Sequence, residues 1–193
     1  MRSTLRWTQW VLFASAFLLL GYCVFVLTNA WFFQKRANAE LERLVQVRVS
    51  NPTPRTVPPR VLAIGDLIGR IEVPRLGLSV VVIEGSGAPV LRRAAGHIEG
   101  TGMPGRAGNI GVAAHRDTYF RPLRNIQLND LIKLTTARAE YRYRVVSTKV
   151  VSPSEVSVLR PDSNEILTLV TCYPFFLVGP APSRFIVRAE RDR

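Results

Sequence analysis

The sequence predicts a mainly β domain, built from many short strands, behind one N-terminal membrane helix. No charged residue occurs between Arg6 and Lys35, so the chain begins with a long apolar segment. Short apolar and β-branched runs then recur to the C-terminus, separated by turns that contain glycine or proline. Such spacing of short strands favours a closed barrel or a sandwich.

The apolar segment from Trp10 to Phe33 is predicted to be a transmembrane helix, residues 10–33. A bilayer core about 30 Å thick requires roughly 20 helical residues, so this window is long enough to span it. Trp7, Trp10 and Trp31 stand at its two ends, as expected for interfacial aromatic anchors.

Two interpretations of this segment are open, an uncleaved anchor and a signal peptide. Thr28-Asn29-Ala30 resembles a cleavage site, but the apolar stretch is longer than the usual signal core of roughly 7–15 residues. We therefore expect a single-pass anchor, within which Cys23 is a small apolar residue. Basic residues flank both ends and do not decide the orientation. Because the globular part is C-terminal, we expect residues 1–9 in the cytoplasm and the domain outside the cell membrane.

Residues 34–62 are predicted to be a juxtamembrane segment and a proline-rich spacer, and residues 63–193 a globular domain. The polar stretch from Gln34 to Val49 can continue the membrane helix for a few turns. Residues 51–59 contain four prolines, which favour an extended, semi-rigid chain. About 130 residues remain after the spacer, enough for one hydrophobic core.

Within the domain, hydrophobic patterns predict strands, one short helix and one loop. One or two helical turns are expected at residues 90–95, and residues 100–105 are expected to form a loop because of their glycine and proline content. Strands are expected at residues 69–73, 78–83, 109–114, 131–135, 140–151, 166–172 and 183–189.

The net charge of +12 does not indicate a nucleic-acid partner. Only three of the 26 basic residues are lysines, and the arginines are scattered along the chain and not gathered into a basic block. An arginine bias of this kind reflects base composition, and we expect no nucleic-acid binding.

Cys172 is the only cysteine outside the apolar segment, so it has no partner for a structural disulfide. The domain also contains two histidines, His97 and His115, and Arg184 follows the thiol. A thiol nucleophile, a proton donor and a cation that stabilises an oxyanion are the groups that acyl transfer requires. One cysteine and two separated histidines give no zinc pattern. We therefore expect no metal and no other cofactor, and the sequence leaves open whether a loop binds calcium.

Three motifs resemble those of the sortase family, which are membrane-anchored cysteine transpeptidases. Thr168-Leu169-Val170-Thr171-Cys172 resembles the family's TLxTC signature, and Ala114-His115-Arg116-Asp117-Thr118 its histidine motif. Ser183-Arg184-Phe185-Ile186-Val187 resembles the last strand, which carries the catalytic arginine. The order of the motifs agrees, and the resemblance covers about residues 63–193. Tyr173-Pro174-Phe175, with the short stretch to Arg184, is most similar to class D. Ala114 departs from the glycine of many relatives, and a methyl group is compatible there unless the position needs a positive φ.

The resemblance implies an eight-stranded β-barrel with one or two short helices, in which residues 63–193 form the catalytic domain. It implies that Cys172 attacks the Thr–Gly bond of an LPxTG-like sorting signal and forms a thioester. The acyl acceptor would be an amine of a wall peptide or pilin lysine, or else water, in surface anchoring or pilus assembly. His115 would move protons, and Arg184 would bind the substrate carbonyl or the oxyanion. Thr171 would contact the substrate or oxyanion through its hydroxyl or the nearby backbone.

Alternatives exist for individual residues and for the whole domain. Arg188 lies on the same strand face as Arg184 and is the fallback for its role. His97 is expected to make local hydrogen bonds in a loop, and Asp117 to cap a turn more than to orient His115. An L,D-transpeptidase is disfavoured because its histidine usually lies close to the cysteine in sequence. A non-catalytic membrane-tethered β-module would leave Cys172 inert to thiol reagents.

Overall fold

The computed structural model describes residues 2–50, 62–177 and 179–192. The proline-rich stretch at residues 51–59 lies outside them. The first element is the helix α1 (Arg2–Ser50), so the helix continues well beyond the apolar segment. The strands are β1 (Leu67–Val73), β2 (Leu78–Glu84), β3 (Ala95–His97), β4 (Gly108–Ala113), β5 (Leu131–Thr136), β6 (Glu140–Val151), β7 (Glu165–Tyr173) and β8 (Ser183–Arg191). The short helices are η1 (Pro74–Leu76), α2 (Ala88–Leu91), η2 (Arg121–Asn125) and η3 (Val156–Leu159).

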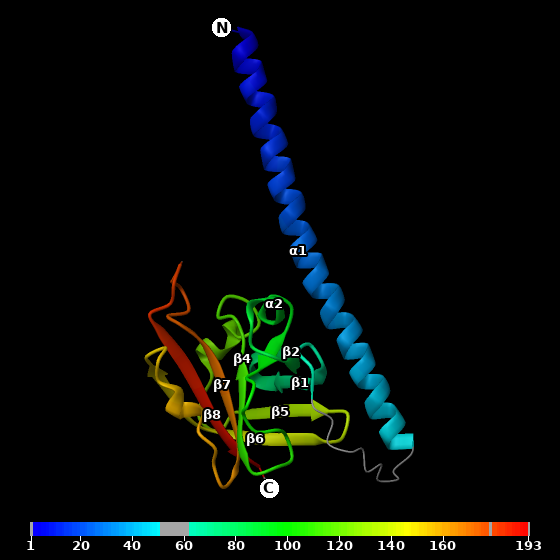
Figure 1. Cartoon of the computed structure of the whole chain (residues 1–193), viewed down its shortest axis with the longest axis vertical. Helices are drawn as coiled ribbons and strands as arrows, with labels where there is room; N and C mark the ends of the chain where they lie inside the picture. The colour runs from blue at the N-terminus through cyan, green and yellow to red at the C-terminus, as the bar shows by residue number, and fades with distance from the viewer. Residues whose placement is uncertain (1, 51–61, 178, 193) are drawn as a thin grey trace.

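The strands form a closed barrel of eight strands in the order β1-β2-β3-β4-β7-β8-β6-β5 (Figure 1). Pairing of β5 with β1 closes it, with Gly69 opposite Thr136. The pairs β2–β3 and β4–β7 are parallel, and the other pairs are antiparallel. The mainly β class and the eight-stranded barrel are therefore confirmed.

One strand, β3, was not expected from the sequence. It has only three residues, with Gly96 at its centre, so it shows no measurable alternation of apolar and polar side chains. Its position depends on close backbone packing, because a methyl group on Gly96 would collide with the carbonyl oxygen of Gly85. Glycine permits such an approach, and a pattern of hydrophobic side chains does not reveal it.

The barrel interior is filled by aliphatic side chains with few polar atoms. Phe120, Leu123 and Tyr143 are fully buried, and they pack with the isoleucine, leucine and valine side chains of the strands. The Tyr143 hydroxyl donates to Glu165 Oε1 at 2.5 Å, which satisfies its polar end. Burial, with that hydrogen bond, raises the pKa of Tyr143 above the ordinary value.

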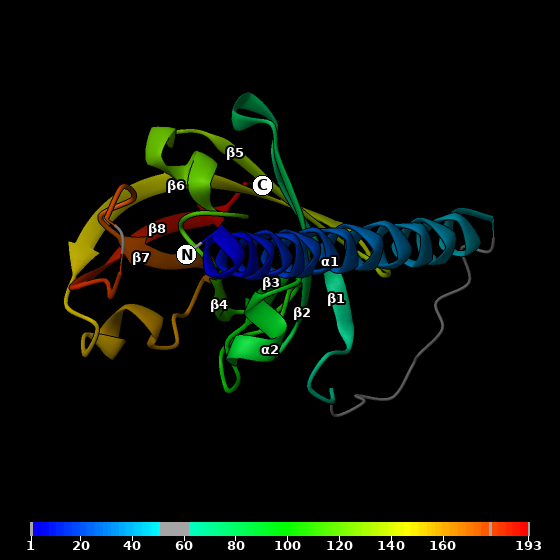
Figure 2. The same cartoon turned by 90° about the horizontal axis from the view of Figure 1, so that it is seen from above.

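The C-terminal half of α1 packs against the outside of the barrel, beside β1 and β2 (Figures 1 and 2). Phe33 and Ala37 contact the buried cluster that contains Val81, and Leu41 is 1% exposed. By length and composition, the N-terminal part of α1 satisfies the requirements for a membrane-spanning helix. Its apolar side chains are exposed in the structure, as lipid-facing residues would be.

Candidate active site

The site lies where two parallel strands end together. β4 and β7 are neighbours, with Ala113 opposite Val170, so their C-terminal ends meet at one edge of the barrel. Cys172 stands near the end of β7 and is partly exposed. On the other side of β7, Cys172 is directly opposite Arg184 of β8. Directly opposite residues point to the same face of a sheet, so the thiol and the guanidinium belong to one face.

His115 follows β4 and is held beside β7 by two hydrogen bonds of its neighbour Ala114. The Ala114 amide donates to the Val170 carbonyl at 3.2 Å, and the Thr171 hydroxyl donates to the Ala114 carbonyl at 2.7 Å. His115 is therefore one residue beyond a backbone unit fixed to the strand that carries Cys172. The three expected residues thus come from the adjoining ends of β4, β7 and β8.

Ala114 itself is buried in the core, at 5% exposure. Asn129 is the only non-glycine residue with a positive φ among residues 2–50, 62–177 and 179–192. The position before the histidine therefore does not need glycine in this chain.

The two candidate arginines of β8 have different partners. Arg184 Nη1 donates to the carbonyl of Ser183 at 3.0 Å and reaches the Ala181 carbonyl at 3.4 Å. Arg188 Nη2 instead donates to Asp162 Oδ2 at 2.5 Å, an ion pair. Backbone N–H donation by Asn164, followed by the Arg188 contact, lowers the pKa of Asp162 below its ordinary value.

Thr171 is 2% exposed, and its hydroxyl proton is used in the bond to Ala114. The structure therefore gives this hydroxyl a positioning contact with the strand before His115. Asp117 is exposed in the turn that follows His115.

Arg116 is a residue whose importance was not evident from the sequence. Its side chain is buried and donates to three backbone carbonyls of the loop after Cys172. Nη1 binds the Pro174 carbonyl at 3.0 Å, and Nη2 binds those of Leu177 and Gly179 at 2.7 Å each. The histidine motif therefore supplies the guanidinium that holds the β7–β8 loop. The only sequence signal was that Arg116 belongs to that motif.

Aromatic rings cluster where β7 and β8 meet the core, with Phe185 opposite Thr171 and therefore on the other face of the sheet from the Cys172–Arg184 pair. Phe175 and Phe185 are 5.4 Å apart between centroids in an edge-on arrangement, and Tyr173 stacks on Phe185 at 6.3 Å. Phe175 and Phe185 also pack against the barrel core. This aromatic cluster is therefore continuous with the hydrophobic core.

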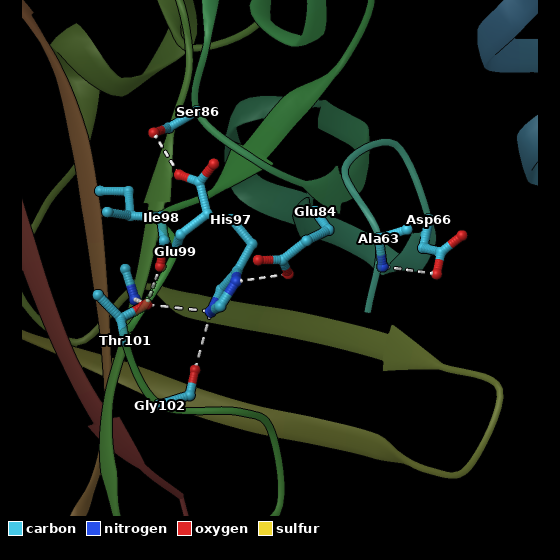
Figure 3. A network of polar contacts seen from close by, with 10 residues as sticks. Ala63, Asp66, Glu84, Ser86, His97, Ile98, Glu99, Thr101 and Gly102 are labelled. Atoms are coloured by element: carbon cyan, nitrogen blue, oxygen red, sulfur yellow. Dashed lines mark hydrogen bonds and ion pairs between the residues drawn. The ribbon is translucent and has the colours of Figure 1, made fainter. Parts of the chain in front are cut away.

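The second histidine, His97, belongs to a separate buried network on β3, where it stands opposite Val112 of β4 (Figure 3). Its Nδ1 lies 2.8 Å from Glu84 Oε2, and its Nε2 lies 3.0 Å from the Gly102 carbonyl and from Thr101 Oγ1. Thr101 donates its own proton to the Ile98 carbonyl. Both ring nitrogens of His97 therefore have hydrogen-bond partners within the protein. His97 makes local hydrogen bonds as expected, although it lies on β3 and not in a loop.

In the part of the chain that the structure describes, no three His, Cys, Asp or Glu side chains gather into a possible metal site. The site's polar chemistry thus consists of a thiol, an imidazole and guanidinium groups.

Comparisons with known proteins agree with this arrangement. A sortase domain model matches residues 71–192, which is more than half of the chain. Sortase D of Bacillus subtilis is 34% identical over 128 residues, 66% of this chain and 65% of that protein. Sortase SrtE1 of Streptomyces coelicolor is 30% identical over 172 residues, 79% of this chain and 49% of that protein. The chain thus matches about half to two thirds of the length of these relatives.

Among solved structures, the Sortase D5 transpeptidase of Clostridium perfringens superimposes with a TM-score of 0.69 at 28% identity. The match covers 83% of this chain and 99% of that one. The expected similarity to sortases, class D included, is confirmed by the family model, by the relatives and by the fold. The chain belongs to the sortase family.

Proposed function

We propose that this protein is a cysteine transpeptidase in which Cys172, His115 and Arg184 carry the reaction. The observation that supports this most strongly is the meeting of three strand ends. Cys172 stands opposite Arg184, and His115 follows the residue that Thr171 binds. The order and motif positions of these residues match the family's pattern.

In the proposed reaction, Cys172 gives its thiol proton to His115, and the sulfur attacks the carbonyl carbon of the scissile peptide bond. The C–N bond breaks, and its electron pair leaves with the nitrogen, which takes a proton from His115. The thioester that remains is then attacked by an amine, which gives a proton to His115 as the new amide forms. The C–S bond breaks, and the sulfur leaves with its electron pair and takes that proton back, which restores the Cys172 thiol. Covalent catalysis of this kind replaces one high barrier with two lower ones.

Arg184 is the proposed oxyanion and carbonyl contact. Its guanidinium is permanently charged and has donors beyond the one that binds Ser183 and Ala181. Arg188 lies opposite Thr168, away from Cys172, and is neutralised by Asp162. This difference favours Arg184 over the fallback.

Thr171 contributes to the proposed site through position. Its hydroxyl ties β7 to the backbone before His115, which fixes the separation of the two strands that carry the thiol and the imidazole. The backbone around Thr171 is the group we propose for substrate contact, because the hydroxyl proton is already used.

The proposed acyl donor is a protein with a C-terminal LPxTG-like sorting signal, and the acceptor is an amine of a wall peptide or pilin, with water as a side path. One neighbour in fold, from Group B Streptococcus, is a pilus-related sortase C. We propose that residues 10–33 of α1 cross the cell membrane with residues 1–9 inside. Residues 34–62 would then connect the span to the catalytic domain, residues 63–193, on the outer side.

The test uses the full-length protein in detergent micelles and a quenched fluorescent peptide with an LPxTG-type signal. Ala substitution of Cys172, His115 or Arg184 is expected to lower kcat/KM by at least about 10²–10³. Arg188→Ala is the matched control on the same strand and is expected to keep kcat/KM near that of the parent. Cleavage by the Cys172→Ala variant at the parental rate would contradict the assignment of Cys172 as the nucleophile. If Arg188→Ala lost activity while Arg184→Ala stayed active, the oxyanion contact would be assigned to Arg188 and not to Arg184.

A further inference from the structure

The docking of α1 determines where the barrel lies relative to the bilayer. Gln34 binds the barrel at two points: its Oε1 accepts from the Val81 amide at 3.0 Å, and its Nε2 donates to the Arg93 carbonyl at 2.7 Å. Leu41, two turns further along the helix, is buried against the barrel. Because α1 is one helix from Arg2 to Ser50, the barrel is attached directly to the helix whose N-terminal part is the proposed membrane span.

This attachment places one edge of the barrel at the membrane surface, provided that α1 spans the bilayer as proposed above. A hydrocarbon core crossed by roughly 20 helical residues, beginning near Trp10, ends near Trp31. Phe33 is two residues further, about 3 Å along the helix axis. The Phe33 ring packs against the barrel's outer cluster, so that cluster lies at headgroup depth.

Basic side chains occupy this edge. Arg92 and Arg93 follow α2, and the Arg93 guanidinium lies 5.0 Å from the centroid of Phe33. Residues 86–98 contain no aspartate or glutamate, so nothing acidic within this segment offsets the two arginines. Lys35 and Arg36 are exposed on α1 at the same level. Basic residues near a bilayer are attracted to anionic lipid headgroups by about 1 kcal/mol each.

The loop between β7 and β8 reaches toward this same end of the molecule. Figure 1 shows the orange-to-red loop rising beside the end of the barrel that faces the N-terminal half of α1. Residues 174–182 contain no charged residue. Phe176 is 79% exposed and Leu177 42% exposed, although both are apolar.

Hydrogen bonds of the loop backbone keep the apolar tip of this loop, Phe176 and Leu177, exposed. Arg116 binds the carbonyls of Pro174, Leu177 and Gly179, so the loop cannot fold its apolar side chains inward without losing those bonds. The Arg124 guanidinium of η2 lies 5.4 Å from the Phe176 ring centroid. An apolar ring beside an arginine is the combination that favours the boundary between headgroups and acyl chains.

We propose that Phe176 and Leu177 insert into the surface of the bilayer that α1 crosses, while Arg92, Arg93 and Arg124 contact anionic phospholipid headgroups. Since the loop begins two residues after Cys172, this contact holds the thiol close to the membrane. The acyl donor of the proposed transpeptidase would then be a protein segment lying at the membrane surface. This last consequence rests on the proposed transpeptidase activity, whereas the lipid contact rests only on the proposed membrane span of α1.

The test places an environment-sensitive fluorophore at single cysteines of the full-length chain in lipid nanodiscs. Cys23→Ala and Cys172→Ala provide the cysteine-free background. Phe176→Cys reports on the loop, and Phe13→Cys reports on the membrane part of α1. Arg138→Cys is the control, because it lies exposed in the β5–β6 turn and the β6–β8 register puts that turn at the end of the barrel far from Arg184. Quenchers attached to lipid near the headgroup and near the acyl terminus measure depth.

The label at position 176 is expected to shift to shorter emission wavelength and to be quenched most by the headgroup-proximal lipid. Both effects should be larger in nanodiscs that contain phosphatidylglycerol than in phosphatidylcholine alone, and the Arg138→Cys label should show neither. A water-exposed label at 176, with the Phe13→Cys label inside the bilayer, would overturn the loop contact. Equal insertion of the label at position 176 in nanodiscs with and without phosphatidylglycerol would overturn the role of the arginines. A Phe13→Cys label in water would overturn the membrane premise, whereas peptide cleavage by the unlabelled parent tests the enzyme separately.

Discussion

Replacing Arg116 by alanine removes the donor that holds the β7–β8 loop. The guanidinium makes three hydrogen bonds to backbone carbonyls, and its side chain is only 9% exposed. In Arg116→Ala the carbonyls of Pro174, Leu177 and Gly179 lose their charged partner, and a cavity remains beneath the loop. We expect the loop to become mobile while the barrel stays folded, because the loop lies outside the strands.

The magnitude follows from the number and kind of bonds. A hydrogen bond to a charged group contributes about 1.5–3 kcal/mol, so three at the lower limit contribute about 4.5 kcal/mol. Leu177 and Gly179 are exposed, so their carbonyls can bind water once released, and part of this energy is recovered. We therefore expect the free energy of unfolding to fall by about 2–3 kcal/mol. Misplacing a reacting group by about 1 Å can cost about 10²-fold in rate, so kcat/KM should fall by roughly that factor.

The assay combines denaturant unfolding, peptide cleavage and amide hydrogen exchange of residues 175–177, in parallel with Arg106→Ala. Arg106 is exposed in the β3–β4 loop and is the matched control for loss of one positive charge. Arg116→Lys keeps the charge but not the planar fork, and its cleavage rate should lie between those of the parent and Arg116→Ala. If Arg116→Ala matched the parent in unfolding, exchange and kcat/KM, the assignment of Arg116 as the residue that holds the loop would be refuted.

Two further predictions concern stability. Hydrogen bonds from Arg75, opposed by burial and aided by the Gln127 amide, hold the pKa of Asp130 below its usual range. The stabilisation from this low pKa is present above the unfolded carboxyl pKa of about 3.9 and is lost as the pH falls through the folded value. Asp130→Asn should therefore flatten the acid limb of melting temperature against pH, and an unchanged acid limb would contradict the linkage. Gly69→Ala would drive a methyl group into the Thr135 carbonyl between β1 and β5, at an expected cost of about 1–3 kcal/mol in denaturant unfolding. Gly87→Ala, where a methyl group meets only an ordinary contact at 3.7 Å, is its control, and equal stability of the two variants would oppose the close-packing argument.

The sequence predicted the longer strands because their apolar residues alternate or run together. β6 and β7 matched closely, since β-branched residues and flanking turns mark their ends. It did not predict β3, whose three residues depend on a backbone approach at Gly96. The local pattern of apolar and polar residues carries no information on backbone contacts between separate segments of the chain.

The candidate site was predictable only as far as its motifs extend. Cys172, His115 and Arg184 were predicted from their type and order, and the barrel brings their strand ends together. The role of Arg116 could not be predicted from the sequence, because its partners are backbone carbonyls, which have no sequence signature. The packing of α1 against the barrel could not be predicted for a related reason. Gln34 seemed to be an ordinary polar residue after a membrane span, and only the fold places Val81 and Arg93 beside it.

The most direct test of the proposed chemistry is intact-mass spectrometry of the full-length protein mixed with a library of LPxTG-type peptides. The parent is expected to gain the mass of a peptide acyl group and to lose it when an amine is added. The Cys172→Ala variant should gain nothing. A free Cys172 that reacts with a thiol reagent but forms no adduct with any peptide would contradict the proposed acyl donor. A Cys172 that reacts with neither would contradict the enzyme and favour a tethering module.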